Sequence, residues 1–270
     1  ELDVICRDFM RAILPYAAGN IHPRFFGWVH GSGTPTGALA DFLAAVMNSN
    51  VGGRDHGAVY VERQVIEWSR QLFSFPATSS GVLTTGSSTA NLIALLVART
   101  KMLGPAARDH GMDPGAGRLI GYCSTATHNC IRRAFEITGL GSASLNALPA
   151  GHDHRLDPAE LERAIAGDRA RGLRPFMIIA NAGSVDAGAI DPLDALADLA
   201  ARENLWLHVD GAFGATAILA PSVAPRLRGI ERADSIAFDF HKWLHVPYDA
   251  GCVLVRDAAV HHATFAAPAP

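Results

Sequence analysis

The chain contains two lysines, and one of them lies in a setting that suits chemistry. Lys101 is expected near the end of a helix, where a solvated lysine is ordinary. Lys242 follows a short apolar stretch and has His241 and Trp243 as its neighbours. A lysine that is withdrawn from water loses proton affinity and becomes an amine nucleophile. The structural alternative is a lysine whose methylene stem packs on apolar groups while its amine reaches water.

A turn of small residues lies between a predicted strand and a long predicted helix. It runs from Thr85 to Asn91 and includes Gly86, Ser87 and Ser88. Backbone amides at such a turn can converge on an anion, and the positive end of the helix dipole adds to the attraction. The turn lacks the lysine of a P-loop and the glycine spacing of a dinucleotide-binding loop. A tight turn in which a serine or threonine caps the helix is the structural alternative.

Two further polar residues fall where predicted elements meet. Asp210 closes the apolar strand 205–209, and a carboxylate in that position requires a cation or an N–H group beside it. A helix cap or a structural ion pair would meet the same requirement. His128 follows Thr127 at a strand-to-helix turn, where a single histidine is more often a cap or a surface residue. Each of the two residues is ambiguous when taken alone.

Taken together, these features describe one site. Ligands of parallel α/β sheets lie beyond the carboxyl ends of the strands, and the small-residue turn, Asp210, His128 and Lys242 all fall at predicted strand ends. Pyridoxal 5′-phosphate (PLP) needs phosphate donors, an acid for its ring nitrogen and a lysine for a Schiff base. The residues match those needs, so PLP is the predicted cofactor.

Several segments, in this order along the chain, resemble the PLP-dependent group II amino-acid decarboxylases, the family of the aromatic-L-amino-acid and glutamate decarboxylases. They are residues 84–92, 127–129, 181–185 with 188–191, 208–212, and 234–235 with 239–243. Weaker similarity reaches residues 22–25 and 247–251. The ordered set is specific to the family, although no single segment is, and the resemblance covers most of the chain.

The resemblance implies a role for each matched position. Lys242 would form the Schiff base, Asp210 would pair with the pyridine nitrogen, and His128 would stack on one face of the ring; these three are the predicted catalytic residues. The methyl group of Ala212 would pack on the other face. The further cofactor contacts that the resemblance implies are Gly86, Ser87 and Ser88 at the phosphate, together with Ser184, Asp239 and His241.

The implied reaction is decarboxylation of an L-amino acid to an amine and CO₂, in a cytoplasmic homodimer. An aminotransferase or carbon–sulfur lyase of the same fold is one alternative, and a truncated, non-catalytic homologue is another. The substrate side chain is left open, because Thr89, Val185 and Gly211 depart from residues that are common in the family. Relatives run well beyond 400 residues, so the 270 residues of this chain are expected to lack a C-terminal small domain and a mobile catalytic loop.

The elements that must position these residues alternate between strands and helices from residue 80 onward. Strands are expected at 81–85, 118–123, 143–148, 176–180, 205–209, 234–238 and 251–256, with helices between most of them. This rhythm predicts a mostly parallel α/β sheet covered on both faces, and the resemblance implies the seven-stranded type of sheet of the fold type I PLP enzymes. Residues 1–79 are expected to form an N-terminal helical segment and lead-in, and 80–270 the large PLP-binding domain.

Composition excludes several other classes. With a net charge of −3 and 49% hydrophobic residues, the chain offers no general electrostatic attraction to nucleic acid, and it has no apolar run long enough for a transmembrane helix. Its four cysteines show no CxxC pair, which favours free thiols in a reducing compartment. His152 and His154 lack a third ligand nearby, so no metal site is predicted.

Overall fold

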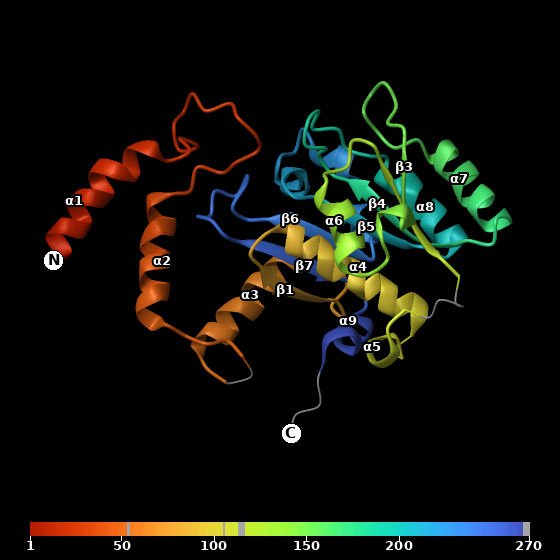
Figure 1. Ribbon diagram of the computed structural model, residues 1–270, viewed down its shortest axis with the longest axis horizontal. Coiled ribbons are helices and arrows are strands. Elements are labelled where there is room, and N and C mark those ends of the chain that lie inside the picture. The colour runs from red at the N-terminus through yellow and green to blue at the C-terminus, as the bar shows by residue number, and fades with distance from the viewer. Residues whose placement is uncertain (53–54, 105, 113–116, 267–270) are drawn as a thin grey trace.

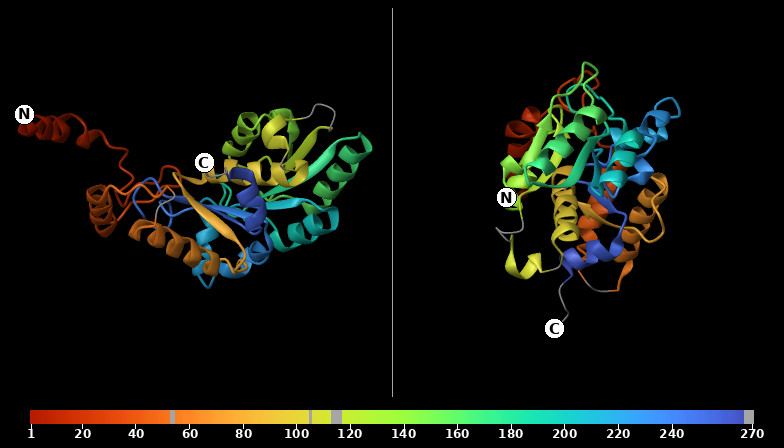
Figure 2. Two further views of the ribbon diagram at one scale, coloured as in Figure 1. Left: turned by 90° about the horizontal axis from the view of Figure 1, so that it is seen from below. Right: turned by 90° about the vertical axis from the view of Figure 1, so that its right-hand side faces the viewer.

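The computed structural model describes residues 1–52, 55–104, 106–112 and 117–266, and it shows three N-terminal helices followed by a central sheet (Figure 1). These helices are α1 (Leu2–Ala12), α2 (Pro35–Met47) and α3 (Gly57–Leu72). Helix α1 extends away from the sheet at one end of the molecule (Figure 2). It ends before Pro15, which lies in the 3₁₀ turn Leu14–Tyr16 and has no N–H group with which to continue the helix.

The sheet has seven strands in the order β1-β7-β6-β5-β4-β2-β3. They are β1 (Ser80–Thr84), β2 (Leu119–Ser124), β3 (Leu145–Leu148), β4 (Arg174–Asn181), β5 (Trp206–Asp210), β6 (Ser235–Asp239) and β7 (Gly251–Val255). Strands β2 to β6 pair in parallel, and β7 is antiparallel to both β1 and β6. The predicted mostly parallel, seven-stranded sheet is therefore confirmed.

The connection between β6 and β7 explains the change of direction. Parallel neighbours require a crossover of a dozen or more residues, usually with a helix. Only residues 240–250 separate these two strands, and they form a loop that returns β7 beside β6. This loop carries Lys242, which places the lysine at the carboxyl end of β6.

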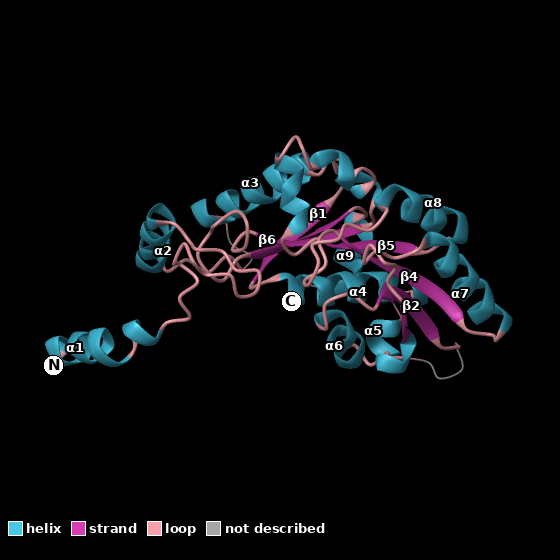
Figure 3. Ribbon diagram, turned by 90° about the horizontal axis from the view of Figure 1, so that it is seen from above, coloured by secondary structure: helices cyan, strands magenta, loops and turns pink. Residues whose placement is uncertain are grey.

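Helices cover both faces of the sheet (Figure 3). Along β4, Ile178 joins one core cluster with Leu196, whereas Met177 and Ile179 join the other with Phe135. Because successive side chains of a strand point to opposite faces, a strand buried on both sides needs an unbroken apolar run. The covering helices after α3 are α4 (Ser87–Leu103), the short α5 (Ala107–His110), α6 (Cys130–Ile137), α7 (Pro158–Ala170), α8 (Leu193–Glu203) and α9 (Ala258–Phe265).

Most predicted boundaries agree with the structure to within about two residues. Helices α5 and α9 were not predicted, nor were the short 3₁₀ turns, which are Ser142–Ser144, Gly214–Leu219, Ala224–Leu227 and Ile230–Arg232. Such short segments show too few turns for a helical period to be visible. Among the residues that the structure describes, no helix is long and apolar enough to cross a bilayer.

Candidate active site

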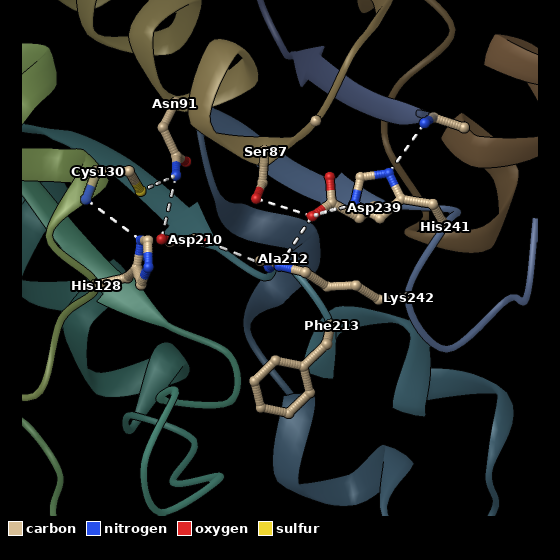
Figure 4. Close-up of polar contacts among 12 residues, drawn as sticks. Ser87, Asn91, His128, Cys130, Asp210, Ala212, Phe213, Asp239, His241 and Lys242 are labelled. Carbon is tan, nitrogen blue, oxygen red and sulfur yellow. Dashed lines mark hydrogen bonds and ion pairs between the residues drawn. The ribbon is translucent and has the colours of Figure 1, made fainter. Parts of the chain in front are cut away.

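Most of the residues that the sequence singled out line one cavity, at the carboxyl ends of β5 and β6 (Figure 4). Gly86, Ser184 and Asp239 lie behind its wall. The cavity has a volume of about 280 Å³. Its wall includes Ser87, Ser88, His128, Asp210, Ala212, His241 and Lys242. A larger hollow of about 740 Å³ lies around Asn204, Asp234 and Arg256, and none of the predicted site residues lines it. The chemistry of the wall, rather than the size of the hollow, therefore marks the site.

Lys242 is held at the edge of this cavity by the last residue of β6. Its Nζ lies 2.9 Å from Oδ2 of Asp239. The same carboxylate oxygen accepts a hydrogen bond of 2.9 Å from Oγ of Ser87. Asp239 is almost fully buried, whereas the Lys242 side chain is 21% exposed. The ion pair thus fixes the amine in a place that remains open toward the cavity.

The start of α4 forms the expected anion cradle. Helix α4 begins at Ser87 with Gly86 as its N-cap, and no side chain of the described chain caps it. The first N–H groups of a helix lack intrahelical partners, so an uncapped start can donate them to an anion. Close by, Oδ1 of Asp239 is buried without a hydrogen-bond partner among the described residues. A hydrogen-bond donor on a bound ligand would satisfy it.

Asp210 has both of its carboxylate oxygens hydrogen-bonded at the end of β5. Oδ2 accepts from Nδ2 of Asn91 at 3.1 Å, and Oδ1 accepts from the backbone N–H of Ala212 at 3.2 Å. Burial raises the pKa of Asp210, and the N–H group of Ala212 and the nearby Lys242 and His128 oppose that rise. The N–H partners that the sequence required are present, while the cavity side of the carboxylate remains accessible to a ligand cation.

His128 and Ala212 line the same cavity. Nδ1 of His128 accepts a hydrogen bond of 3.2 Å from the backbone N–H of Cys130, the first residue of α6. The histidine therefore accepts from the first N–H group of the helix, beside the N-cap residue Asn129. Because its Nδ1 is an acceptor, a neutral His128 carries its proton on Nε2. This hydrogen bond and a role in the cavity are compatible for this residue.

His241 packs against Tyr248, with ring centroids 4.2 Å apart. Its Nδ1 accepts from the backbone N–H of Ala250 at 2.9 Å, so its other ring nitrogen faces Asp239 at 3.5 Å. Burial lowers the pKa of His241, although Asp239 acts in the opposite direction. A neutral ring with its proton on Nε2 is the form that these contacts favour.

Ser184 does not line the cavity. Its side chain is buried, and its Oγ accepts a hydrogen bond of 3.1 Å from the backbone N–H of Ala189. The cavity wall at this point is formed by its neighbours, Gly183 and Val185. A direct contact between Ser184 and the cofactor stays a prediction.

The aromatic part of the wall was not predicted from the sequence. Trp28 and His30, from the loop before α2, line the cavity together with Phe213 and Tyr248. The loop lies tightly on the lysine segment, since a Cβ at Gly31 would be 2.0 Å from the carbonyl oxygen of His241. The glycine-rich stretch 31–33 was a sign of close backbone approach, but nothing in the local sequence named the partner more than 200 residues away.

The fold and the cavity define a class of protein, the PLP-dependent enzymes of fold type I. A family model described as the pyridoxal-dependent decarboxylase conserved domain matches residues 1–268. The chain belongs to this family, whose members use PLP to decarboxylate amino acids.

Individual relatives agree with this assignment. The chain is 38% identical over 248 residues to an aromatic-L-amino-acid decarboxylase of Bacillus atrophaeus, covering 90% of this chain and 49% of the relative. A solved structure from Vibrio parahaemolyticus is also similar: the glutamate decarboxylase domain of diaminobutyrate-pyruvate transaminase and L-2,4-diaminobutyrate decarboxylase. The superposition has a TM-score of 0.93 at 30% identity, and it covers 97% of this chain and 58% of that one. An Oryza sativa TDC structure with PLP and tryptamine gives a TM-score of 0.87 at 29% identity, covering 100% of this chain and 57% of the other. The chain thus spans about half the length of the relatives it matches.

The residues present fit PLP. An uncapped helix start with Ser87 and Ser88 suits the phosphate, Asp210 suits a protonated ring nitrogen, and Lys242 supplies an amine at the edge of the same cavity. Within the part of the chain that the structure describes, no cluster of His, Cys, Asp and Glu could hold a metal ion.

Proposed function

We propose that the protein containing this chain decarboxylates an L-amino acid with PLP, and that Lys242 carries the cofactor covalently. The observation that supports this best is the meeting of the Lys242 amine, the Asp210 carboxylate and the uncapped start of α4 at one cavity. When bound, the cofactor supplies an electron sink for the electrons of the broken Cα–carboxylate bond. The following steps concern what the residues of this chain do.

Asp210 keeps a proton on the cofactor ring nitrogen by remaining ionised beside it. An ion pair in a buried site is stronger than in water, so this interaction contributes several kcal/mol to the electron sink. His128 and Ala212 lie on the cavity wall where they can hold the ring between them. Ser87, Ser88 and the N–H groups at the start of α4 bind the phosphate, with Gly86 leaving room for it.

To hold the cofactor covalently, the Lys242 amine would have to give up a proton. Oδ2 of Asp239, at 2.9 Å from Nζ, is close enough to accept that proton. His241 lies against the same carboxylate and holds the side of the cavity next to the lysine. Ser184 supports the neighbouring loop through its hydrogen bond to Ala189 and is proposed to stand near the cofactor and substrate.

The aromatic wall bears on the substrate side chain. Trp28, Phe213 and Tyr248 present aromatic rings to the cavity, and Phe213 also packs on Trp243 with ring centroids 4.9 Å apart. Flat apolar surfaces of this kind favour an aromatic substrate over an acidic one. The relative from Bacillus atrophaeus is named for aromatic amino acids, which supports the same choice.

We also propose a homodimer in the cytoplasm. Helices α1 and α2 expose large apolar residues, among them Ile5, Phe9 and Phe42, that a second copy of the chain could cover. The four cysteines are free, as expected for a reducing compartment. We propose that residues 80–270 form the PLP-binding domain, with residues 1–79 as its helical lead-in.

One experiment tests the activity. The full-length protein is loaded with PLP, reduced with borohydride and digested, and the modified peptide is identified by mass spectrometry. We expect the adduct on Lys242, and release of CO₂ with formation of the amine from an aromatic amino acid. A keto acid product would favour the aminotransferase alternative, and an adduct without any turnover would favour a non-catalytic homologue. An adduct on another lysine would refute the proposed site.

A further inference from the structure

A row of buried side chains leads away from Asp210 into the core, and the proposed reaction does not use them. Nδ2 of Asn91 lies 3.1 Å from the Asp210 carboxylate, and Oδ1 of Asn91 lies 2.7 Å from Nε2 of His208. Nδ1 of His208 lies 2.9 Å from Oγ of Ser235, which accepts from Nε1 of Trp206 at 2.8 Å. We refer to Asn91, His208, Ser235 and Trp206 as the Asp210 relay.

The direction of each hydrogen bond in the relay follows from its ends. Oδ1 of Asn91 can only accept, so Nε2 of His208 carries a proton and donates it to Asn91. In a neutral ring Nδ1 then accepts from the hydroxyl of Ser235, and that hydroxyl oxygen accepts from the indole N–H of Trp206. The amide of Asn91 in turn donates to Asp210, and its Nδ2 also donates to Sγ of Cys130 at 3.3 Å. Every bond therefore points toward the carboxylate.

The state of His208 agrees with this direction. The side chain is fully buried, and burial lowers the pKa of His208 to about 3. The ring is therefore neutral at physiological pH and carries one proton, which the contact with Asn91 places on Nε2. In a neutral imidazole one ring nitrogen donates a hydrogen bond and the other accepts one, so the ring passes the direction of the series from Ser235 to Asn91.

We propose that the Asp210 relay positions the Asp210 carboxylate and keeps it ionised. The buried hydrogen bonds of the relay all run in one direction, and the last of them donates to Oδ2 of Asp210. The inference rests on the proposed pairing of Asp210 with the cofactor ring nitrogen. Burial alone would favour the protonated acid, and the hydrogen bond from Nδ2 of Asn91 acts against this by lowering the pKa of Asp210. Since hydrogen-bonded groups in a low dielectric polarise one another, the series strengthens its last donor. Its four members act through Asp210 and do not themselves touch the reacting atoms.

A buried polar pair elsewhere in the sheet supplies a matched control. Oη of Tyr122 donates to Oδ2 of Asp168 at 2.8 Å, and both residues are buried. Neither residue lines the cavity. Tyr122→Phe removes one buried hydrogen bond without touching the relay, so it reports what a merely structural loss does to the protein.

The first test reads the relay in the cofactor-free, full-length protein. Nitrogen NMR of ¹⁵N-labelled histidine, assigned with His208→Gln, should show the Nε2–H tautomer of His208 in the parent and in Tyr122→Phe. The Nδ1–H tautomer would refute the direction of the series. Because no cofactor is present, this result stands whether or not the proposed function does.

The second test measures the effect on Asp210 in the protein loaded with ring-¹⁵N-labelled PLP. Asn91→Leu keeps the approximate size of the side chain but removes both the donor to Asp210 and the acceptor for His208. We expect the PLP dissociation constant to rise about tenfold to a hundredfold, from the loss of a hydrogen bond to a charged group. The ring-nitrogen signal should shift toward its unprotonated position.

A change farther from Asp210 in the relay should have a smaller effect on PLP affinity. Ser235→Ala should weaken PLP binding several-fold, and Ser235→Thr should restore it because the hydroxyl returns. Tyr122→Phe should lower the melting temperature and leave the ring-nitrogen signal unchanged. The inference would be overturned if Asn91→Leu matched Tyr122→Phe in both affinity and nitrogen signal.

Discussion

The cavity wall and the N-terminal helices differ in which side chains they bury. Around the cavity, buried polar groups are paired with one another, as Asp210 is with Asn91 and Asp239 is with Ser87. In α1 and α2, among the residues described, none is buried, and large apolar side chains face solvent. The site is thus fixed within the sheet, whereas α1 and α2 can gain hydrophobic free energy only against another surface.

The loop between these two helices is the exception that joins the two regions. Gly31 lies against the backbone of His241 and Lys242, and Trp28 and His30 line the cavity. The N-terminal region therefore completes the site through one loop, although its helices gain little from the sheet. Four predictions test whether polar pairing in one region and exposed apolar surface in the other have the consequences expected.

Replacing the central amine should produce the largest effect. Lys242→Ala should abolish covalent attachment of PLP, since no other amine lines the cavity in the described part of the chain. Absorbance of the bound cofactor, before and after borohydride reduction, measures this directly. Lys101→Ala is the control, because Lys101 is exposed and its nearest carboxylate is Asp257 at 3.6 Å. Equal attachment in both variants would mean that the polar region does not hold the cofactor.

Neutralising Asp210 should have the next largest effect. Asp210→Asn retains the size of the side chain and an oxygen acceptor, so PLP should still bind. Turnover should fall by up to about a hundredfold, because a buried hydrogen bond to a charged group contributes up to about 3 kcal/mol. The measurement is kcat with the best amino acid from the substrate panel. Asp198→Asn is the control, because Asp198 forms an exposed ion pair with Arg232, and it should leave kcat unchanged. A near-normal kcat in Asp210→Asn would contradict the pairing of Asp210 with the cofactor ring nitrogen.

The same substitution in the two regions should separate their contributions to stability. Ile178→Ala in β4 should lower the free energy of unfolding by about 2 to 5 kcal/mol, since Ile178 is fully buried. Ile5→Ala in α1 should change that free energy by less than about 0.5 kcal/mol, because Ile5 is 66% exposed. Denaturant unfolding gives both values. Sedimentation at several concentrations should show weaker self-association for Ile5→Ala, and unchanged association would oppose the proposed dimer surface.

The buried histidine of the relay should make stability depend on pH. The pKa of His208 is lowered to about 3 by burial, from 6.5 for an exposed histidine. Below pH 6.5 this histidine binds a proton in the unfolded chain but not in the folded protein. The free energy of unfolding is therefore greatest above pH 6.5 and falls as the pH drops toward 3. The slope is about 1.4 kcal/mol per pH unit, which gives a loss of about 2 kcal/mol between pH 7 and pH 5.

Urea unfolding of the parent and of His208→Gln at both pH values isolates this contribution. The variant lacks the titrating ring, so it should lose about 2 kcal/mol less than the parent over that interval. His152→Gln, in an exposed loop, is the matched histidine control and should follow the parent. Parallel curves for the parent and His208→Gln would show that burial of His208 does not couple to protonation.

The sequence predicted much of this fold because its signals are local. Apolar runs such as Phe176–Ala180 mark strands that are buried on both faces, and their alternation with helices implies a parallel sheet. The direction of β7 escaped this reasoning. An apolar strand reads the same in either direction, and only its pairing with β1 and β6 decides the matter.

The candidate site was predictable to the extent that its residues fall at strand ends. Asp210 and Lys242 could be selected for that reason, and the structure brings them to one cavity. Asn91 could be read only as part of a turn, and His208 only as part of a strand. Their hydrogen bond joins positions 117 residues apart, so no local pattern could reveal it.

The sequence by itself determined which chemical groups are available and on which kind of element each one lies, because residue type and local periodicity are written in neighbouring positions. Tertiary structure decided which of these groups meet. It placed Asp239 beside Lys242, closed the cavity with Trp28 and His30, and aligned the donors of the Asp210 relay. Such contacts depend on the packing of the whole sheet. Burying a polar group costs free energy, and a hydrogen bond to a partner far away in the chain offsets that cost.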